Sequence, residues 1–341
     1  MPIKTINDFL KLNFPKENIS PRYNISDVYG ASLVAKEYCG IKYFAKPING
    51  EWEHGIAEPH RSLDPILLTS SKMGDRKFQY WVARKDQEVY LEQNGYSKVK
   101  AIGLPIVYVK QQKTRRYRNS LLVMPVHSLD YTSHQRDSEN YAKFILNLQS
   151  EFSEIVICIH PSCIKHGYWI DSFKKYGFKI ITGASTNDWS SLHKICLLMS
   201  SFEFMTTNGP GSHLGYGAYL GCKVSIAGDY VENKRQDYAN TPFYQNNPKT
   251  LEANLESLSK NIYMKNHPEY FCHPKQAKQQ IKLGKFLVGY ENKISPEEMK
   301  KLFHWNLSSR FSFSISHLFI RTSKYLNSFL KKSYDKFSKI S

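Results

Sequence analysis

Residues 120–227 constrain the fold more than any other part of this chain. Short, continuous apolar runs alternate there with longer segments whose apolar residues recur at helical spacing. A parallel sheet covered by helices on both faces requires this pattern, because its strands are buried on both sides. The stretch therefore predicts a doubly wound α/β domain. The expected strands lie at 120–125, 154–159, 178–181, 202–205 and 223–226, and the expected helices at 138–149, 164–176, 189–199 and 212–220.

Polar residues follow three of these predicted strands at their carboxyl ends. His127 and Ser128 follow the first strand, His160 and Pro161 the second, and a Gly-rich run at 206–213 the fourth. Ligands of doubly wound sheets bind beyond these ends. Because an imidazole can donate a hydrogen bond to a phosphate oxygen and a helix start attracts anions, we expect the loops to bind a phosphate group. The candidates in the Gly-rich run are Thr206, Thr207, Asn208, Gly209, Gly211, Ser212 and His213.

The Gly-rich run also argues against several classes of enzyme. No Gly-Lys-Ser/Thr follows it, and its spacing differs from GxGxxG, which disfavours kinases, ATPases and nicotinamide enzymes. A plain tight turn, with Ser212 as a helix N-cap, is the alternative interpretation. The chain has no CxxC pair and no acidic pair suited to Mg²⁺, so we expect no metal, no other cofactor and no disulfide.

Residues 1–115 show the same alternation in shorter segments, which predicts a smaller Rossmann-like domain. Strands are expected at 41–45, 65–69, 78–82 and 99–102, with a turn at 49–55. This turn carries Glu53 and His54, and either side chain can take the proton of an attacking hydroxyl. A surface loop with a hydrogen-bonded histidine is the alternative. The basic run 110–119 is interpreted as the linker to a nucleotide-binding domain at 116–290.

The chain is strongly basic, with 47 Lys and Arg against 30 Asp and Glu and a formal charge of +17. Phosphates, nucleic acid and anionic lipids are the partners that such a charge favours. The last segment, 291–341, mixes aromatic and aliphatic residues with basic ones. This pattern is typical of helices in a lipid interface, and a terminal helix pair packed on the domains is the alternative. The expected membrane contacts are Arg310, Arg321, Lys324, Lys331 and Lys332.

Other features of the sequence bear on location and partners. No apolar run approaches the length of a membrane span, and the first residues lack the apolar core of a signal peptide. We therefore expect a cytoplasmic protein, peripheral at the inner face of the cell membrane. The basic residues accompany no RNA-binding aromatic motif and no helix-turn-helix, so no nucleic-acid partner is expected.

Together, the acidic/His-Gly turn, the His-Pro pair and the Ser/Gly-rich loop resemble the motifs of GT-B glycosyltransferases, over about residues 28–228. More narrowly, they resemble bacterial surface-polysaccharide enzymes with CMP- or CDP-activated donors, namely sialyl-, Kdo- and glycerolphosphate-transferases. The resemblance implies two Rossmann-like domains facing a central cleft, with amphipathic helices at the C-terminus. It implies that the first domain, 1–115, is on the acceptor side and that the second binds the nucleotide sugar. It implies that His160-Pro161 and Ser212 or Thr207 contact the donor phosphate. It also implies that Glu53, with His54 at the second acidic position, supplies the base.

The resemblance predicts an inverting, metal-independent glycosyltransferase that moves a sugar from a nucleotide donor to a lipopolysaccharide, capsule or related glycan. The helix after the Gly-rich loop has no Glu to hold a ribose, which favours a CMP- or CDP-linked donor. The expected partners are this donor, a glycan or glycolipid acceptor and an anionic membrane surface. A UDP- or GDP-hexose transferase or a sugar-nucleotide epimerase on the same fold is the alternative among enzymes. From another class, the charge allows a non-catalytic protein that binds nucleic acid or membranes.

Overall fold

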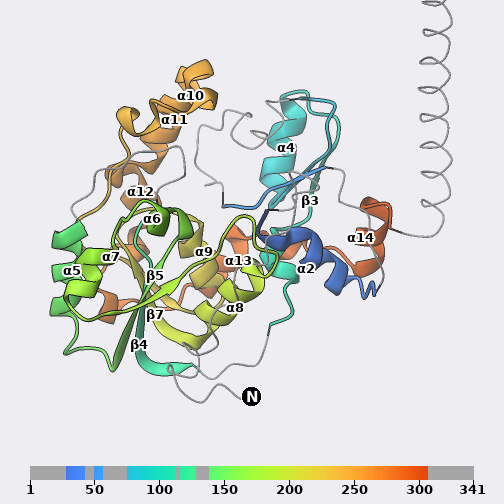
Figure 1. Ribbon diagram of the computed structural model, residues 1–341. Helices are drawn as coiled ribbons and strands as arrows, with labels where there is room; N and C mark the ends of the chain where they lie inside the picture. Colours follow the sequence, from blue (N-terminus) through green and yellow to red (C-terminus); the bar gives the residue numbers. More distant parts are fainter. Residues whose placement is uncertain (1–27, 43–49, 57–74, 112–115, 128–137, 306–341) are drawn as a thin grey trace, which may run out of the picture. The chain divides into compact units, whose positions relative to one another are not determined.

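A computed structural model describes residues 28–42, 50–56, 75–111, 116–127 and 138–305 of the chain. Contacts divide the chain into two compact units. The first unit, Met1–Tyr38 with Pro47–Lys293, holds two parallel sheets (Figure 1). The second, Cys39–Lys46 with Ile294–Ser341, holds α14 (Pro296–Leu302), whose N-terminus is capped by Ser295 and Glu298. The domain boundaries expected near 115 and 290 stay a prediction.

The larger sheet has five parallel strands in the order β6-β5-β4-β7-β8. They are β4 (Tyr117–Val123), β5 (Glu154–Ile159), β6 (Lys179–Thr182), β7 (Phe202–Thr207) and β8 (Lys223–Ile226). All five apolar runs predicted as strands are strands, and the α/β fold class is confirmed. Numbered along the chain, the order is 3-2-1-4-5, which is the Rossmann order. The direction of winding reverses between β4 and β7, and ligands of such sheets bind at this reversal point.

Helices cover both faces of this sheet because the strands are apolar on both sides. α5 (Ser138–Asn147) and α7 (Ile170–Lys175) pack on one face, where Leu121, Ile157 and Phe173 belong to one buried cluster. α8 (Ser191–Ser201) and α9 (Ser212–Tyr219) contact each other and pack on β7 and β8. A Cβ on Gly217 of α9 would lie 2.9 Å from Met205 Cε, so α9 approaches β7 closely. Five further helices of this part of the chain are α6 (Pro161–Lys165), α10 (Pro242–Asn246), α11 (Pro248–Leu258), α12 (Lys260–Asn266) and α13 (Ile281–Leu287).

The smaller sheet has three parallel strands in the order β1-β2-β3. They are β1 (Glu51–Trp52), β2 (Tyr80–Val82) and β3 (Val99–Ala101), with α4 (Lys85–Gln93) between β2 and β3. The 3-10 turn η1 (Val28–Gly30) and α2 (Ala31–Tyr38) precede the sheet, and η3 (Pro105–Tyr108) follows it.

Two of the strands predicted for this half, at 78–82 and 99–102, are confirmed with slightly shorter bounds. The strand predicted at 65–69 lies outside the described residues, and Ile41 and Lys42 are not in a strand. The turn predicted at 49–55 is wrong at its centre, where β1 forms. Trp52 explains this, because it is 1% exposed and its indole N–H donates to the carbonyl oxygen of Gly103 at 2.8 Å.

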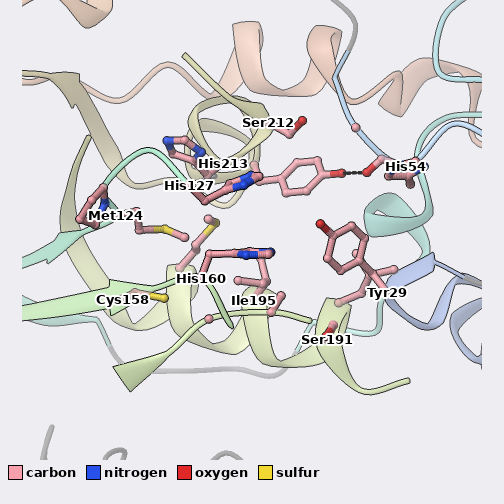
Figure 2. Close-up of a pocket in the computed structure, with 17 residues that line it drawn as sticks. Tyr29, His54, Met124, His127, Cys158, His160, Ser191, Ile195, Ser212 and His213 are labelled. Atoms are coloured by element: carbon pink, nitrogen blue, oxygen red, sulfur yellow. Dashed lines mark hydrogen bonds between the residues drawn. The ribbon is translucent and has the colours of Figure 1, made fainter. Parts of the chain in front are cut away.

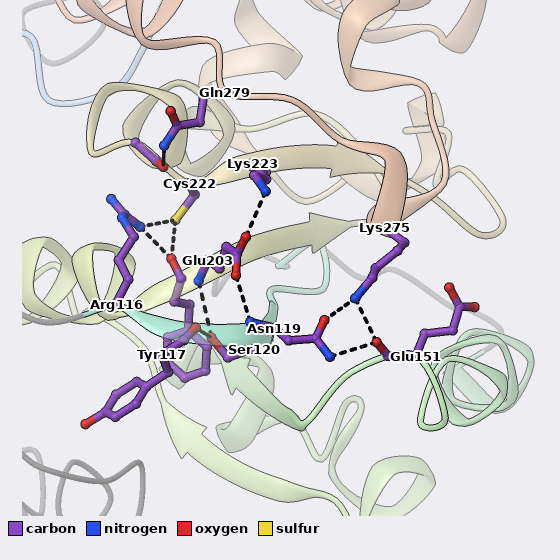
Figure 3. Close-up of polar contacts among 12 residues, drawn as sticks. Arg116, Tyr117, Asn119, Ser120, Glu151, Glu203, Cys222, Lys223, Lys275 and Gln279 are labelled. Atoms are coloured by element: carbon purple, nitrogen blue, oxygen red, sulfur yellow. Dashed lines mark hydrogen bonds and ion pairs between the residues drawn. The ribbon is translucent and has the colours of Figure 1, made fainter.

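The linker interpretation of 110–119 is wrong for its last residues, which are part of the sheet domain. β4 begins at Tyr117, and the Arg116 guanidinium donates to the carbonyl oxygens of Met199, Phe202 and Leu220 (Figure 3). These oxygens belong to the C-terminal ends of α8 and α9, where carbonyls lack helical partners and a cation is favoured. Arg116, which lies in the linker predicted from the sequence, therefore stabilises the C-terminal ends of two helices.

A second cation on this sheet pairs with a carboxylate. Glu203 of β7 accepts hydrogen bonds from Lys223 Nζ and from the backbone N–H of Asn119, both at 2.7 Å (Figure 3). Burial alone would raise the pKa of the Glu203 carboxyl. The bonds from Lys223 and Asn119 outweigh burial and hold this pKa below its ordinary value of 4.5.

Candidate functional site

A cavity of about 270 Å³ lies at the reversal point of the larger sheet. Its lining comes from the segments that follow β4, β5 and β6, from α8 and from the start of α9. Tyr29, His54 and Gly55, from the first part of the chain, complete it (Figure 2). Because Rossmann sheets bind their ligands at this point, the cavity is the candidate site.

The lining combines apolar side chains with histidines. Met124, Leu192, Ile195 and Met199 are among the apolar ones, and the buried thiol of Cys158 lies with them. The four histidines are His54, His127, His160 and His213. An apolar surface beside a few convergent polar groups is the usual composition of a small-molecule site.

Three of the histidines stand at strand ends, as their positions in the sequence suggest. His127 follows β4, His160 follows β5, and His213 lies in the first turn of α9 after β7. The rings of His127 and His160 are stacked, with centroids 4.4 Å apart and planes 21° from parallel. The sheet therefore brings imidazoles from separate strands into one cavity (Figure 2).

The hydrogen bond at Nδ1 defines the tautomer of the neutral His160 ring. His160 is the N-cap of α6: its Nδ1 accepts from the backbone N–H of Ser162 at 3.2 Å. Pro161 follows at the first helical position, where a missing N–H is harmless. An accepting Nδ1 places the proton of the neutral ring on Nε2. The Nε2 atoms of His160 and His213 are both buried without a hydrogen-bond partner. Since buried polar atoms normally have partners, these two atoms indicate a place for a polar ligand.

The same two imidazoles are neutral at pH 7. Burial lowers the pKa of His160 from 6.5 to about 3, and the neighbouring His127 lowers it further. Burial, with His127 again adding to it, lowers the pKa of His213 to about 3 as well. An anion bound between the rings would oppose both effects, because it favours the charged imidazolium.

Within the Gly-rich run, the structure separates residues that line the cavity from residues that shape the loop. Thr206, Thr207 and Asn208 are fully buried and bonded inside the fold. Asn208 Oδ1 accepts from the backbone N–H of Val126 at 3.0 Å, which ties the loop after β7 to the loop that carries His127. Only Ser212 and His213 of this run line the cavity.

The two predicted glycines of this run permit close packing. A Cβ on Gly209 would lie 2.6 Å from Val126 Cγ2, and a Cβ on Gly211 would lie 2.6 Å from Cε1 of the His213 ring. Their absence of a side chain lets the loop and the imidazole take their observed places.

Ser212 connects the cavity to residues 54–56. Its Oγ accepts from the backbone N–H of Ile56 at 2.8 Å. One turn later in α9, the Tyr216 hydroxyl donates to the backbone oxygen of His54 at 2.7 Å (Figure 2). A Cβ on Gly215 would lie 2.2 Å from Ile56 Cδ1, so glycine is needed for this approach. These contacts fix the position of His54 at the cavity.

Glu53 and His54, the two candidate bases, have different surroundings. The Glu53 carboxylate accepts from the backbone N–H of Ala83 at 2.7 Å and from Gln87 Nε2 at 2.9 Å. Ala83 directly precedes the N-cap of α4 and Gln87 lies in its first turn, so this carboxylate is at the helix N-terminus, where a negative charge is favoured. His54 lines the cavity, and its ring centroid is 6.1 Å from that of Tyr29.

Several predicted residues lie outside the described part of the chain, namely Ser128, Arg310, Arg321, Lys324, Lys331 and Lys332. Among the described residues, no group of three or more His, Cys, Asp or Glu is placed to hold a metal ion. No helix in this described part has the length and apolar character needed to cross a membrane. The six cysteines are free thiols, and five are buried.

Sequence reasoning missed the residues that reach the cavity from outside the strand-end loops. Tyr29 is one, because no pattern in the sequence shows that η1 lies beside the larger sheet. Leu192, Ile195 and Met199 are others. In the sequence they have the spacing of ordinary core positions of a helix, and their place at the cavity follows only from the fold of the larger sheet.

Comparisons with known proteins give distant structural likenesses. No protein-family model matches the chain, and none of the curated proteins compared with it matches. A UDP-GlcNAc 2-epimerase from Methanocaldococcus jannaschii is 14% identical, over 76% of this chain and 81% of that one, with a TM-score of 0.34. The UDP-GlcNAc 2-epimerase from Neisseria meningitidis is 11% identical, over 85% and 84%, with a TM-score of 0.34. The pneumococcal O-GlcNAc transferase GtfA is 11% identical, over 75% and 52%, with a TM-score of 0.31. Likenesses at these scores establish neither a family nor an activity for this chain.

Proposed function

We propose that this protein is a glycosyltransferase that binds a nucleotide sugar in the cavity at the reversal point of the larger sheet. The observation that carries the proposal is the convergence of His127, His160 and His213, two of which bury an unpartnered Nε2. A phosphate oxygen is an acceptor that satisfies such donors. The apolar surface formed by Leu192, Ile195 and Met199 suits the flat base of a nucleotide.

The polar groups of the cavity suit glycosyl transfer from a donor whose leaving group is a phosphate. In the proposed reaction, the acceptor hydroxyl attacks the anomeric carbon while the bond from that carbon to the phosphate oxygen breaks. The electron pair stays on the leaving phosphate, where hydrogen bonds from His160 and His213 would stabilise the added charge. The acceptor proton passes to a general base. Direct displacement of this kind inverts the anomeric centre.

His54 is the base that we propose, because it lines the cavity whereas both oxygens of Glu53 are bonded to the start of α4. His54→Gln should abolish transfer while leaving nucleotide affinity within a few-fold of the original. Glu53→Gln is the matched variant. It should lower the thermal stability, and it should reduce transfer less than His54→Gln does. The opposite pattern would identify Glu53 as the base.

The donor and acceptor are further parts of the proposal. α9 has no carboxylate side chain for a ribose, which supports a CMP- or CDP-linked donor over a UDP-hexose. The acceptor that we propose is a lipopolysaccharide, capsule or related glycan at the inner face of the membrane. Binding of the full chain to vesicles with and without anionic lipid tests the membrane part, since each basic residue near such a surface adds on the order of 1 kcal/mol.

A ligand screen tests the proposal as a whole. Thermal unfolding is measured with CMP, CDP, UDP and GDP, and a nucleotide at about 100 times its Kd should add about 2.7 kcal/mol of stability. His160→Asn and His213→Asn should remove this effect, whereas His166→Asn, at an exposed position, should keep it. If none of the four nucleotides stabilises the protein, the proposal is wrong. Turnover of a nucleotide sugar without acceptor would identify an epimerase or hydrolase instead. A gel shift with nucleic acid at physiological salt would point to the non-catalytic alternative.

A further inference from the structure

The backbone of Tyr29 is in a conformation that its side chain disfavours. Its φ of 59° and ψ of 14° lie in the left-handed region, which glycine and asparagine adopt readily and which an aromatic residue adopts rarely. Energetically unfavourable backbone of this kind persists only where the surrounding structure enforces it, and it concentrates at functional sites.

The structure around η1 shows what enforces this conformation. The backbone N–H of Tyr29 donates to the carbonyl oxygen of Thr186 at 3.0 Å. A Cβ on Gly30, whose φ is 83°, would lie 1.8 Å from the carbonyl oxygen of Trp189. Both contacts attach η1 to the segment between β6 and α8. The same segment lines the cavity with Gly183 and Ala184.

The result of this arrangement is the position of the Tyr29 ring. Val28 and Gly30 on either side are buried, whereas Tyr29 is half-buried and lines the cavity. Figure 2 shows its hydroxyl directed into the cavity, on the same side as His54 and opposite Met124. The ring is therefore part of the cavity surface and not of the buried core.

We propose that Tyr29 is a ligand-contacting residue that binds the sugar of the donor, a hydroxyl-rich group. This inference rests on the proposed function. The phenol can donate to and accept from sugar hydroxyls, and the ring face can cover the apolar C–H groups of the sugar. Because the Tyr29 and His54 rings are 6.1 Å apart, a sugar held by Tyr29 lies beside the proposed base. The histidines at the strand ends hold the phosphate, so phosphate and sugar are recognised by separate residues.

Paired ligands and two variants test this inference. Isothermal titration compares UDP with UDP-N-acetylglucosamine, and CMP with CMP-N-acetylneuraminate. Tyr29→Phe removes only the hydroxyl and should weaken the nucleotide sugar by about three- to tenfold. Tyr29→Asn removes the ring and should weaken it by about tenfold or more, and both variants should bind the free nucleotide within about twofold of the original.

Thermal unfolding supplies a readout that needs no ligand. Asparagine tolerates the left-handed backbone, so Tyr29→Asn should leave the Tm unchanged or raise it by a few degrees. The matched control is Tyr96→Asn, at a 5% exposed tyrosine of the cluster on the smaller sheet, which should lower the Tm clearly.

The outcomes separate this inference from the proposed function. If the unmodified protein binds neither nucleotides nor nucleotide sugars, the proposed function fails and the role of Tyr29 fails with it. If nucleotide sugars bind and the Tyr29 variants weaken sugar and free nucleotide equally, or weaken neither, only the inference fails. A fall in Tm for Tyr29→Asn as large as that of Tyr96→Asn would show a structural role and also overturn it.

Discussion

The two neutral histidines of the cavity should make this protein lose stability in mild acid. Burial holds the pKa of His160 and His213 at about 3 in the folded chain, against an ordinary value of 6.5. Below pH 6.5 the unfolded chain therefore binds protons that the folded chain does not bind. Stability is complete above pH 6.5 and is lost as the pH falls from 6.5 toward 3.

The size of this loss follows from the two pKa values. At pH 5.5, one unit below the unfolded value, each histidine costs about 1.4 kcal/mol, so the pair costs about 3 kcal/mol. That is a large part of the 5–15 kcal/mol of stability typical of a domain. Between pH 7.5 and 5.5 the carboxyl of Glu203 does not contribute, because its stabilisation is lost only as the pH falls below 4.5.

Urea unfolding at pH 7.5 and pH 5.5 measures the effect. His160→Asn and His213→Asn should each reduce the stability difference between the two pH values by about 1.4 kcal/mol. Asparagine at 160 can replace the N-cap of α6, which keeps that variant folded. His166→Asn, at an exposed position of the same segment, is the control and should change nothing. If both cavity variants lose as much stability as the original protein between pH 7.5 and 5.5, the imidazoles are not neutral and the reasoning is wrong.

Three further changes test the packing that holds the cavity. Arg116→Met should cost about 3 kcal/mol in urea unfolding, since it removes hydrogen bonds to carbonyls at two helix ends, and a cost under about 0.5 kcal/mol would contradict the assigned contacts. Glu203→Gln should cost about 1 kcal/mol at pH 7, and because the folded pKa is lowered, the difference from the original protein should shrink as the pH falls below 4.5. A double-mutant cycle with Lys223→Met checks whether this energy belongs to the ion pair. Gly284→Ala in α13 should lower the Tm although alanine is the better helix former, because its Cβ would lie 2.1 Å from the backbone nitrogen of Tyr219; a raised Tm would show a loose contact.

The sequence predicts the larger sheet well because each of its strands is apolar on both faces. Short runs of this kind favour a buried strand, so the five strands between 117 and 226 form where the pattern predicts them. The smaller sheet is harder to predict. β1 is only two residues long, and Trp52 is recognisable as a strand residue only through its bond to Gly103, 51 positions later.

In the candidate site, too, the residues that local sequence places could be predicted, and those that depend on distant contacts could not. A histidine after an apolar run stands at a strand end wherever the sheet forms, so His127, His160 and His213 could be placed together from the sequence. The role of Glu53 could not, because it depends on α4, whose first residues lie about 30 positions further along the chain. The contribution of Tyr29 depends on Thr186 and Trp189, which are more distant still.

The net charge of +17 is also a poor guide to the chemistry of this cavity. Arg116 and Lys223, two cations near the larger sheet, are bonded to carbonyls and to a carboxylate, and none of the described lining residues is a lysine or arginine. An anion entering the cavity therefore meets the neutral imidazoles of His160 and His213, which can hold it by hydrogen bonds and not by a fixed charge. Salt screens interactions between exposed charges strongly and those of buried groups much less. Nucleotide affinity should consequently change little between low and physiological salt in a titration series, and a steep fall with salt would show that fixed charges hold the anion.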